Sequence, residues 1–221
     1  MLNLNLKFKN KNLLRQALTH RSYLNESPNL ELGHNERLEF LGDAVLELVV
    51  TEYLYQNYKS PEGELTSWRA ALVNAEMLSK KAKELGLNDE ILLSKGEAKD
   101  TGKGRNYILA NALEALIGAI YLDQGYEAAE KFIKENILIE LPSILENKLY
   151  LDAKSQFQER AQEEVNITPE YKVLKEWGPD HDKKFKIGVC LGLELVATAI
   201  GSSKQESQQK AAEKALKVKK W

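Results

Sequence analysis

The sequence NERLEFLGDAV occupies residues 35–45 and leads into a helical pattern over 37–58. Apolar residues recur in this stretch at spacings of three and four, the period of an amphipathic helix. At about 100° per residue, the carboxylates fall on one narrow stripe and the aliphatic side chains on the opposite, core-facing side. The members of the acidic stripe are Glu36, Glu39, Asp43 and Glu47.

Stacked carboxylates of this kind repel one another, and each pair costs a few tenths of a kcal/mol. A bound Mg²⁺ removes the penalty because it prefers hard oxygen ligands. An acidic face open to water is the alternative, and the spacing by itself leaves both open. Gly42 costs about 1 kcal/mol in mid-helix, which indicates close approach by another helix. Phe40 lies beside the acids, which indicates a partner surface or a helix packed on two sides.

A second polar pair lies on the helical stretch 108–125, where Asn111 and Glu114 stand three residues apart and project together. Gly118, on the same stretch, permits close packing against Gly42. Taken alone, the pair is also consistent with a surface acid and an unremarkable polar neighbour. A crossing at the two glycines would bring four oxygen-bearing side chains near one ion: Glu39, Asp43, Asn111 and Glu114.

The composition fits a folded protein of one large domain or two ordinary ones, with 221 residues that are 43% apolar and a net charge of −2. Its single cysteine, Cys190, excludes a disulfide scaffold and a zinc site of several thiolates, and we expect it to be buried in a strand. The sequence has no apolar run long enough for a membrane span and no signal-peptide pattern, so we expect a cytoplasmic protein.

The periodicity of the chain changes near residues 146–152. The helical stretches before that point are 11–24, 37–58, 65–85, 108–125 and 127–148, with a glycine- and lysine-rich loop at 94–106. The later elements are a helix at 153–165, strands at 171–177, 185–191 and 193–200, and a helix at 205–218. We therefore predict a mainly α domain over residues 1–147 and an α+β domain of α-β-β-β-α order over 148–221.

These segments together resemble the ribonuclease III family. The family's signature stretch appears as NERLEFLGDAV at 35–45, its second metal-binding segment as ILANALEALIGAIYLDQG at 108–125, and an early segment as ALTHRSY at 17–23. Residues 150–221 resemble the double-stranded RNA-binding domain that follows the nuclease domain in bacterial members. The resemblance therefore covers essentially the whole chain and implies a helical endonuclease domain followed by an RNA-binding domain.

The resemblance also implies roles for the acidic residues. Glu39, Asp43 and Glu114 match metal carboxylates, and Asp43 and Glu114 are the expected catalytic pair. Glu36 matches an acid near the site, and Phe40 an aromatic residue of a homodimer interface. Asn111 stands where the family often has Asp, so the metal set keeps an amide oxygen but loses one charge.

The activity implied by the resemblance is hydrolysis of double-stranded RNA with Mg²⁺, for which Mn²⁺ can substitute. The products would carry 5′-phosphates and two-nucleotide 3′ overhangs, and the substrates would be ribosomal RNA precursors and structured messenger RNA. Two alternatives belong to other classes. One is a catalytically silent RNA-binding dimer, because of Asn111, and the other is a helical adaptor whose acidic stripe binds a basic partner.

RNA contacts are expected in both domains. The candidate phosphate contacts are Lys95, Lys103 and Arg105 in the 94–106 loop and Lys204 and Lys210 at the start of the last helix. In the C-terminal domain, Gln158 and Gln162 lie one turn apart, and the resemblance directs them and the loop residue His181 to minor grooves. The family commonly has two or three lysines where this chain has only Lys204, which predicts fewer phosphate contacts and a shallower salt dependence.

Overall fold

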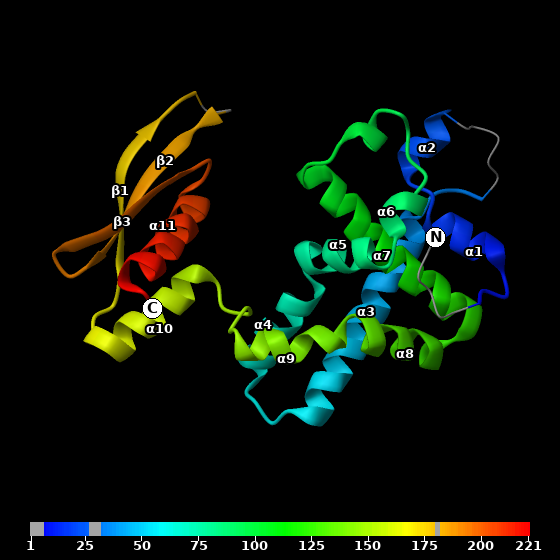
Figure 1. Cartoon of the computed structure of the whole chain (residues 1–221), viewed down its shortest axis with the longest axis horizontal. Helices are drawn as coiled ribbons and strands as arrows, with labels where there is room; N and C mark the ends of the chain where they lie inside the picture. The colour runs from blue at the N-terminus through cyan, green and yellow to red at the C-terminus, as the bar shows by residue number, and fades with distance from the viewer. Residues whose placement is uncertain (1–6, 27–31, 180–181) are drawn as a thin grey trace. The chain divides into compact units, whose positions relative to one another are not determined.

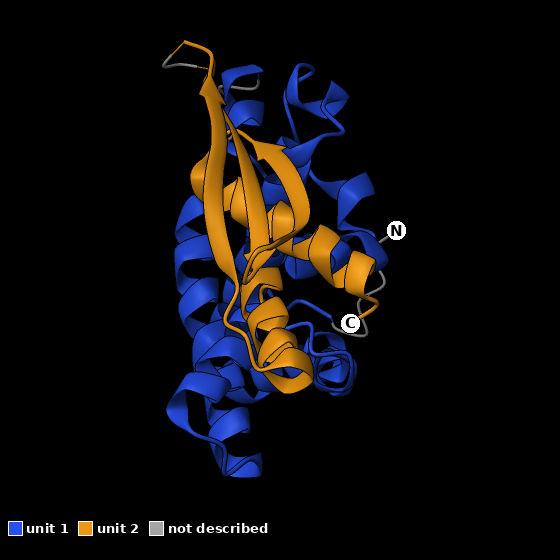
Figure 2. Ribbon diagram, turned by 90° about the vertical axis from the view of Figure 1, so that its left-hand side faces the viewer, with its two compact units in different colours: residues 1–150 blue, residues 151–221 orange. Residues whose placement is uncertain are grey.

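The computed structural model describes residues 7–26, 32–179 and 182–221. The chain divides into two compact units, Met1–Tyr150 and Leu151–Trp221, which Figure 2 shows in different colours. The first unit is helical and the second combines helices with a three-stranded sheet (Figure 1). A mainly α domain followed by an α+β domain was the prediction, and the fold class is confirmed.

Helices form nearly all the regular structure of the first unit (Figure 1). They are α1 (Lys11–Ala17), α2 (Arg21–Glu26), α3 (Glu36–Asn57), α4 (Glu62–Val73), α5 (Ala75–Glu84), α6 (Leu87–Glu90), α7 (Lys103–Gln124), α8 (Tyr126–Asn136) and α9 (Leu141–Glu146). Two 3₁₀ turns, η1 (Glu97–Lys99) and η2 (Leu138–Glu140), complete the unit. In this part of the chain, no described helix is both long and apolar enough to cross a bilayer.

Helix α7 is the centre of the first unit, and α1, α3, α5 and α8 pack around it. Its buried residues point in every direction rather than along one stripe, as expected for a helix surrounded by others. Leu109, Leu113 and Ile117 are fully buried, and each such side chain contributes about 1.5–3 kcal/mol through burial. The position of Glu114 is therefore set by a rigid element.

Helices α3 and α7 cross at Gly42 and Gly118, as the sequence predicted. A Cβ on Gly42 would overlap the backbone carbonyl of Glu114 and stand 2.8 Å from the amide nitrogen of Gly118. A Cβ on Gly118 would overlap the carbonyl oxygen of Leu38. Only glycine permits this approach of the two backbones, so the glycines bring the acidic stripe of α3 beside Glu114.

Three helical stretches that the sequence predicted as continuous are broken. Between α1 and α2 the chain runs alongside Leu92, whose amide donates to the Leu18 carbonyl at 2.8 Å and whose carbonyl accepts from the His20 amide at 3.0 Å. Between α4 and α5, Asn74 leaves the helical conformation and its side chain caps α5 at the Met77 amide. The 127–148 stretch consists of α8, η2 and α9, with Pro142 in the first turn of α9.

The second unit has the predicted α-β-β-β-α order. Its elements are α10 (Ala153–Val165), β1 (Glu170–Trp177), β2 (Lys184–Leu191), β3 (Glu194–Gly201) and α11 (Lys204–Lys219). The sheet is antiparallel in the order β1-β2-β3, and both helices lie on one of its faces (Figure 1). Phe157 of α10, Val189 of β2 and Ala212 of α11 form part of a separate hydrophobic core.

Strand β2 does not show the alternation of buried and exposed residues that is typical of a half-buried strand. It is buried without interruption from Ile187 to Leu191, including Cys190, which confirms that the cysteine is a buried strand residue. The outer side of the strand is covered at Gly188, where a Cβ would fall 2.6 Å from Leu195 and 3.1 Å from Leu174. Long side chains on the two neighbouring strands therefore shield the central strand.

Candidate active site and nucleic-acid interface

Four carboxylates line a single open pocket in the first unit. Its volume is about 390 Å³, and its lining consists of Glu36, Glu39, Phe40 and Asp43 from α3 and Glu114 from α7. The acidic stripe of α3 therefore meets Glu114, as the glycine crossing predicted. Asn111 does not line the pocket; its side chain instead hydrogen-bonds Glu39.

The electrostatics of the pocket disfavour negative charge. Burial, followed by repulsion from Asp43 and Glu39, raises the pKa of Glu114 to about 7. Burial and the neighbouring Glu36 raise the pKa of Glu39, against the opposing effect of the hydrogen bond from Asn111. These carboxylates lie close enough to oppose one another's ionisation, which is the property expected of a site that accepts a cation.

Cations compensate the two ends of the stripe but not its centre. The Arg69 Nε atom lies 2.8 Å from Glu47, and its Nη1 donates to Thr51, so Glu47 is held by α4. At the other end, Glu36 pairs with Arg21 at 3.4 Å. Within residues 7–26, 32–179 and 182–221, no ion pair involves the three central acids, Glu39, Asp43 and Glu114.

The donor chemistry of the central acids fits a hard divalent cation. Oxygen ligands, few of them from the protein and the rest from water or phosphate, are what Mg²⁺ prefers. Among the described residues, no three acidic, histidine or cysteine side chains are already gathered closely enough to hold a metal ion. The carboxylates share one pocket, so a bound ion would require their side chains to turn toward one another.

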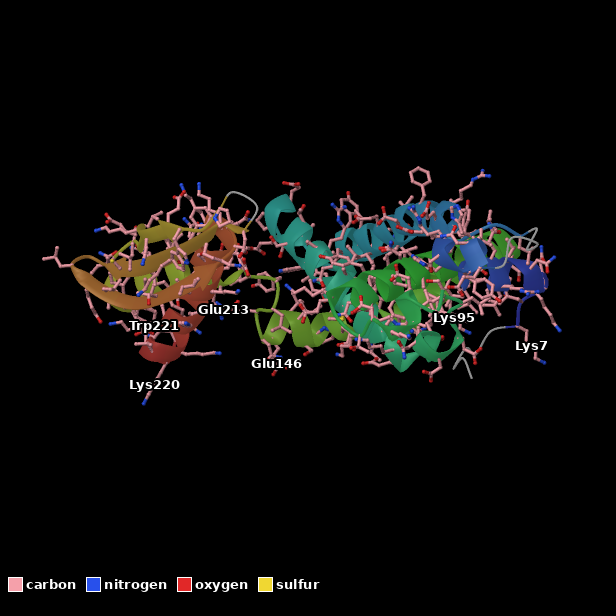
Figure 3. The ribbon with its side chains drawn as sticks, turned by 90° about the horizontal axis from the view of Figure 1, so that it is seen from above. Lys7, Lys95, Glu146, Glu213, Lys220 and Trp221 are labelled. Carbon is pink, nitrogen blue, oxygen red and sulfur yellow. The ribbon has the colours of Figure 1, made fainter. Side chains whose placement is uncertain are left out.

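The three residues of the first unit that were expected to contact phosphate differ in secondary structure and in hydrogen bonding. Lys95 is an exposed residue of the loop before η1 (Figure 3). Lys103 and Arg105 belong to the first turn of α7, so the loop predicted over 94–106 is wrong in its last part. Arg105 is also engaged, because its Nε and Nη2 donate to the side chain and carbonyl of Asn88 at 3.0 and 2.9 Å and so tie α7 to α6.

The second unit presents its candidates on α10 and α11. Gln158 and Gln162 line one hollow of about 460 Å³ on α10, so the predicted shared face is present. Lys204 opens α11 with its Nζ 5.7 Å from the Phe185 ring centre. Lys210 pairs with Glu206 at 2.6 Å, and this bond contributes most to lowering the pKa of Glu206 to about 2. His181 lies outside the described residues.

Three residues that shape the site were not predicted from the sequence. Arg21 and Arg69 pair with the outer acids of the stripe, and buried Asn35 joins the start of α3 to the 17–19 segment. The amide of Asn35 donates to the Thr19 carbonyl at 2.9 Å and its side chain to the Ala17 carbonyl at 3.3 Å. Arg21 lies in the ALTHRSY segment, so the motif was a signal for it, whereas no local pattern indicates Arg69.

Comparison with known families assigns both units. Residues 10–141 match the family model of ribonuclease-III-like domains, and residues 153–219 match the double-stranded RNA binding motif. The fold and the site thus define a two-domain protein in which a ribonuclease-III-like helical domain with an acidic pocket precedes a double-stranded RNA binding motif.

Relatives align with nearly the entire chain. Ribonuclease 3 of Enterococcus faecalis is 46% identical over 211 residues, covering 95% of this chain and 91% of that protein. Ribonuclease 3 of a Nitratiruptor species is 45% identical over 96% of this chain and 91% of its own length. A solved structure of the nuclease domain of ribonuclease III from Campylobacter jejuni is 48% identical, with a TM-score of 0.55 over 62% of this chain and 92% of that one. The chain belongs to the ribonuclease III family.

Proposed function

We propose that this protein is an endoribonuclease that hydrolyses double-stranded RNA with a divalent metal ion, Mg²⁺ or Mn²⁺. The observation that carries the proposal is the pocket at the Gly42–Gly118 crossing, where uncompensated carboxylates meet in a ribonuclease-III-like domain. The same chain carries a double-stranded RNA binding motif, which supplies the substrate class.

Glu39, Asp43 and Glu114 would hold the ion, with the side-chain oxygen of Asn111 as a further candidate. When bound, the ion stabilises negative charge on the phosphate and lowers the pKa of water, so that water can attack phosphorus and the 3′ oxygen can leave. Glu114, whose pKa of about 7 leaves it partly protonated at neutral pH, would lose that proton to solvent on holding the ion. Gln158 and Gln162 bond 2′-hydroxyls in a minor groove, which selects duplex RNA by its shape.

The dimer is the second part of the proposal. Phe40 is 82% exposed, and Leu48 and Tyr55 lie exposed within about 80° of it around α3. An apolar hollow of about 660 Å³ between α3 and α4, lined in part by Tyr55, Tyr58 and Leu65, adjoins this side. The Campylobacter jejuni nuclease domain is described as having a region involved in dimer formation. A homodimer that buries Phe40 gives two sites, one for each RNA strand.

The finer features of the activity are those that membership of the ribonuclease III family implies. The products would carry 5′-phosphates, 3′-hydroxyls and two-nucleotide 3′ overhangs. The substrates would be ribosomal RNA precursors and structured messenger RNA, in the cytoplasm. A catalytically silent RNA-binding dimer is the second candidate function, and the observation in its favour is that Asn111 bonds Glu39 instead of lining the pocket.

A cleavage assay separates the two functions. Labelled duplex RNA is incubated with the protein in Mg²⁺ or in EDTA and resolved on a denaturing gel, with Glu114→Gln and, as a matched control, Glu127→Gln at an exposed position of α8. The expected result is Mg²⁺-dependent cleavage that Glu114→Gln abolishes and Glu127→Gln retains. Intact RNA with the wild-type protein at every Mg²⁺ concentration, together with a shifted band on a native gel, would establish a catalytically silent RNA-binding protein instead.

A further inference from the structure

Helix α2 connects the loop that carries Lys95 to the edge of the acidic pocket. The Ser22 hydroxyl accepts a hydrogen bond from the Ser94 amide at 3.1 Å, and Glu26 accepts one from the Lys95 amide at 3.0 Å. The guanidinium of Arg21, the first residue of the helix, contacts Glu36, one of the residues that line the pocket. Arg21 is therefore a cation beside a pocket whose charged lining residues are all acidic.

The Arg21–Glu36 contact is weakly held. The two atoms, Nη1 and Oε1, are 3.4 Å apart, and the side chains are 71% and 46% exposed. Exposed ion pairs of this kind contribute little to stability, so the guanidinium can leave Glu36 at small cost. The pair at the other end of the stripe differs, because Arg69 contacts Glu47 at 2.8 Å and also donates to Thr51.

An RNA phosphate near the pocket meets repulsion from its carboxylates, and a cation at the border offsets part of that repulsion. A guanidinium suits this task because its forked donors match two phosphate oxygens. We propose that Arg21 binds a backbone phosphate of the RNA next to the acidic pocket, exchanging Glu36 for that phosphate when the duplex arrives. The inference rests on the proposed function and adds a binding residue to it.

The test measures duplex RNA affinity in Mg²⁺ on full-length Glu114→Gln protein, which we expect to bind without cutting. Adding Arg21→Gln is expected to weaken the Kd about 3- to 10-fold and to lower the slope of log Kd against log salt by about one, the value for a single phosphate. Arg21→Lys is expected to retain most of the affinity. Arg15→Gln, which removes the same charge from an exposed position on α1, is expected to change neither quantity. Unchanged affinity and slope in Arg21→Gln would overturn the proposal.

Glu36→Gln in the same background distinguishes a phosphate contact from a role exerted through Glu36. A phosphate contact predicts equal or tighter RNA binding, because the guanidinium is released from its carboxylate partner. If Glu36→Gln weakens binding as much as Arg21→Gln does, Arg21 acts by holding Glu36 and the proposal is wrong. Circular dichroism confirms that each variant is folded, and cleavage by the wild-type protein, measured separately, tests the proposed function itself.

Discussion

At the scale of single residues, the surroundings of Glu114 lower the stability of the folded protein when this side chain is ionised. Its pKa is raised from 4.5 to about 7, so the folded state keeps a proton that the unfolded chain has already lost between those values. The free energy of unfolding therefore falls as the pH rises through this window. Part of the effect is screened because the side chain is not fully buried, which leaves about 1–2 kcal/mol.

Glu114→Gln removes this cost, because the amide cannot ionise. We expect the variant to be more stable than the wild type by about 1–2 kcal/mol at about pH 8 in EDTA, with a smaller gain near pH 5. Urea denaturation at the two pH values measures the difference, and added Mg²⁺ should stabilise the wild type more than the variant. A variant less stable than the wild type at about pH 8 would contradict the repulsion described for the pocket.

Asn111 is the second residue at which a single substitution tests the proposed metal site. Asn111→Asp adds a carboxylate to the three proposed to hold the ion, Glu39, Asp43 and Glu114, so we expect the Mg²⁺ concentration for half-maximal cleavage to fall about 3- to 10-fold. The rise in Tm caused by Mg²⁺ should also begin at a lower concentration, which gives a readout independent of activity. Asn12→Asp on the exposed side of α1 is the matched control. An unchanged Mg²⁺ midpoint for Asn111→Asp would show that position 111 does not contribute to metal binding.

At the scale of helices, the crossing of α3 and α7 depends on two glycines. Gly42→Ala places a methyl group into the Glu114 carbonyl, so the helices must separate, and we expect a loss of about 3 kcal/mol in unfolding free energy and of most of the activity. Gly63→Ala in α4 is the control, because a Cβ there meets nothing within 4 Å and alanine favours a helix. Equal stabilities of the two variants in urea would show that the crossing tolerates a wider spacing.

At the scale of the molecule, each unit has its own hydrophobic core, so each should fold alone. We expect the fragment 151–221 to bind duplex RNA without cutting it. The fragment 1–150 should cut with a KM raised about tenfold or more, because it lacks the RNA contacts of the second unit. Circular dichroism, native gels and cleavage kinetics of the two fragments measure this. An unfolded 151–221 fragment, or cutting by 1–150 at the full-length KM, would contradict separate folding and binding.

The sequence by itself determined the features that depend on local periodicity and residue type. Three features could be predicted: the acidic stripe of α3, the glycines at the helix crossing and the α-β-β-β-α order. The spacing of side chains along the sequence indicates which face of a helix or strand they share, and a glycine in mid-helix indicates close approach by another backbone. Helix ends were less predictable. The break at Leu18–His20 arises from hydrogen bonds with Leu92, a residue more than seventy positions away, and no local pattern contains that contact.

Tertiary structure alone decided which charged groups meet. The sequence predicted that Arg105, in its glycine-rich surroundings, would contact phosphate, but its side chain is hydrogen-bonded to Asn88. Glu47 belongs to the acidic stripe by its spacing, but its carboxylate is paired with Arg69. The pKa of Glu114 likewise depends on α3, which reaches it only through the helix crossing. Charge pairing and desolvation depend on distances in space, whereas the spacing along a chain encodes only the distances within one element.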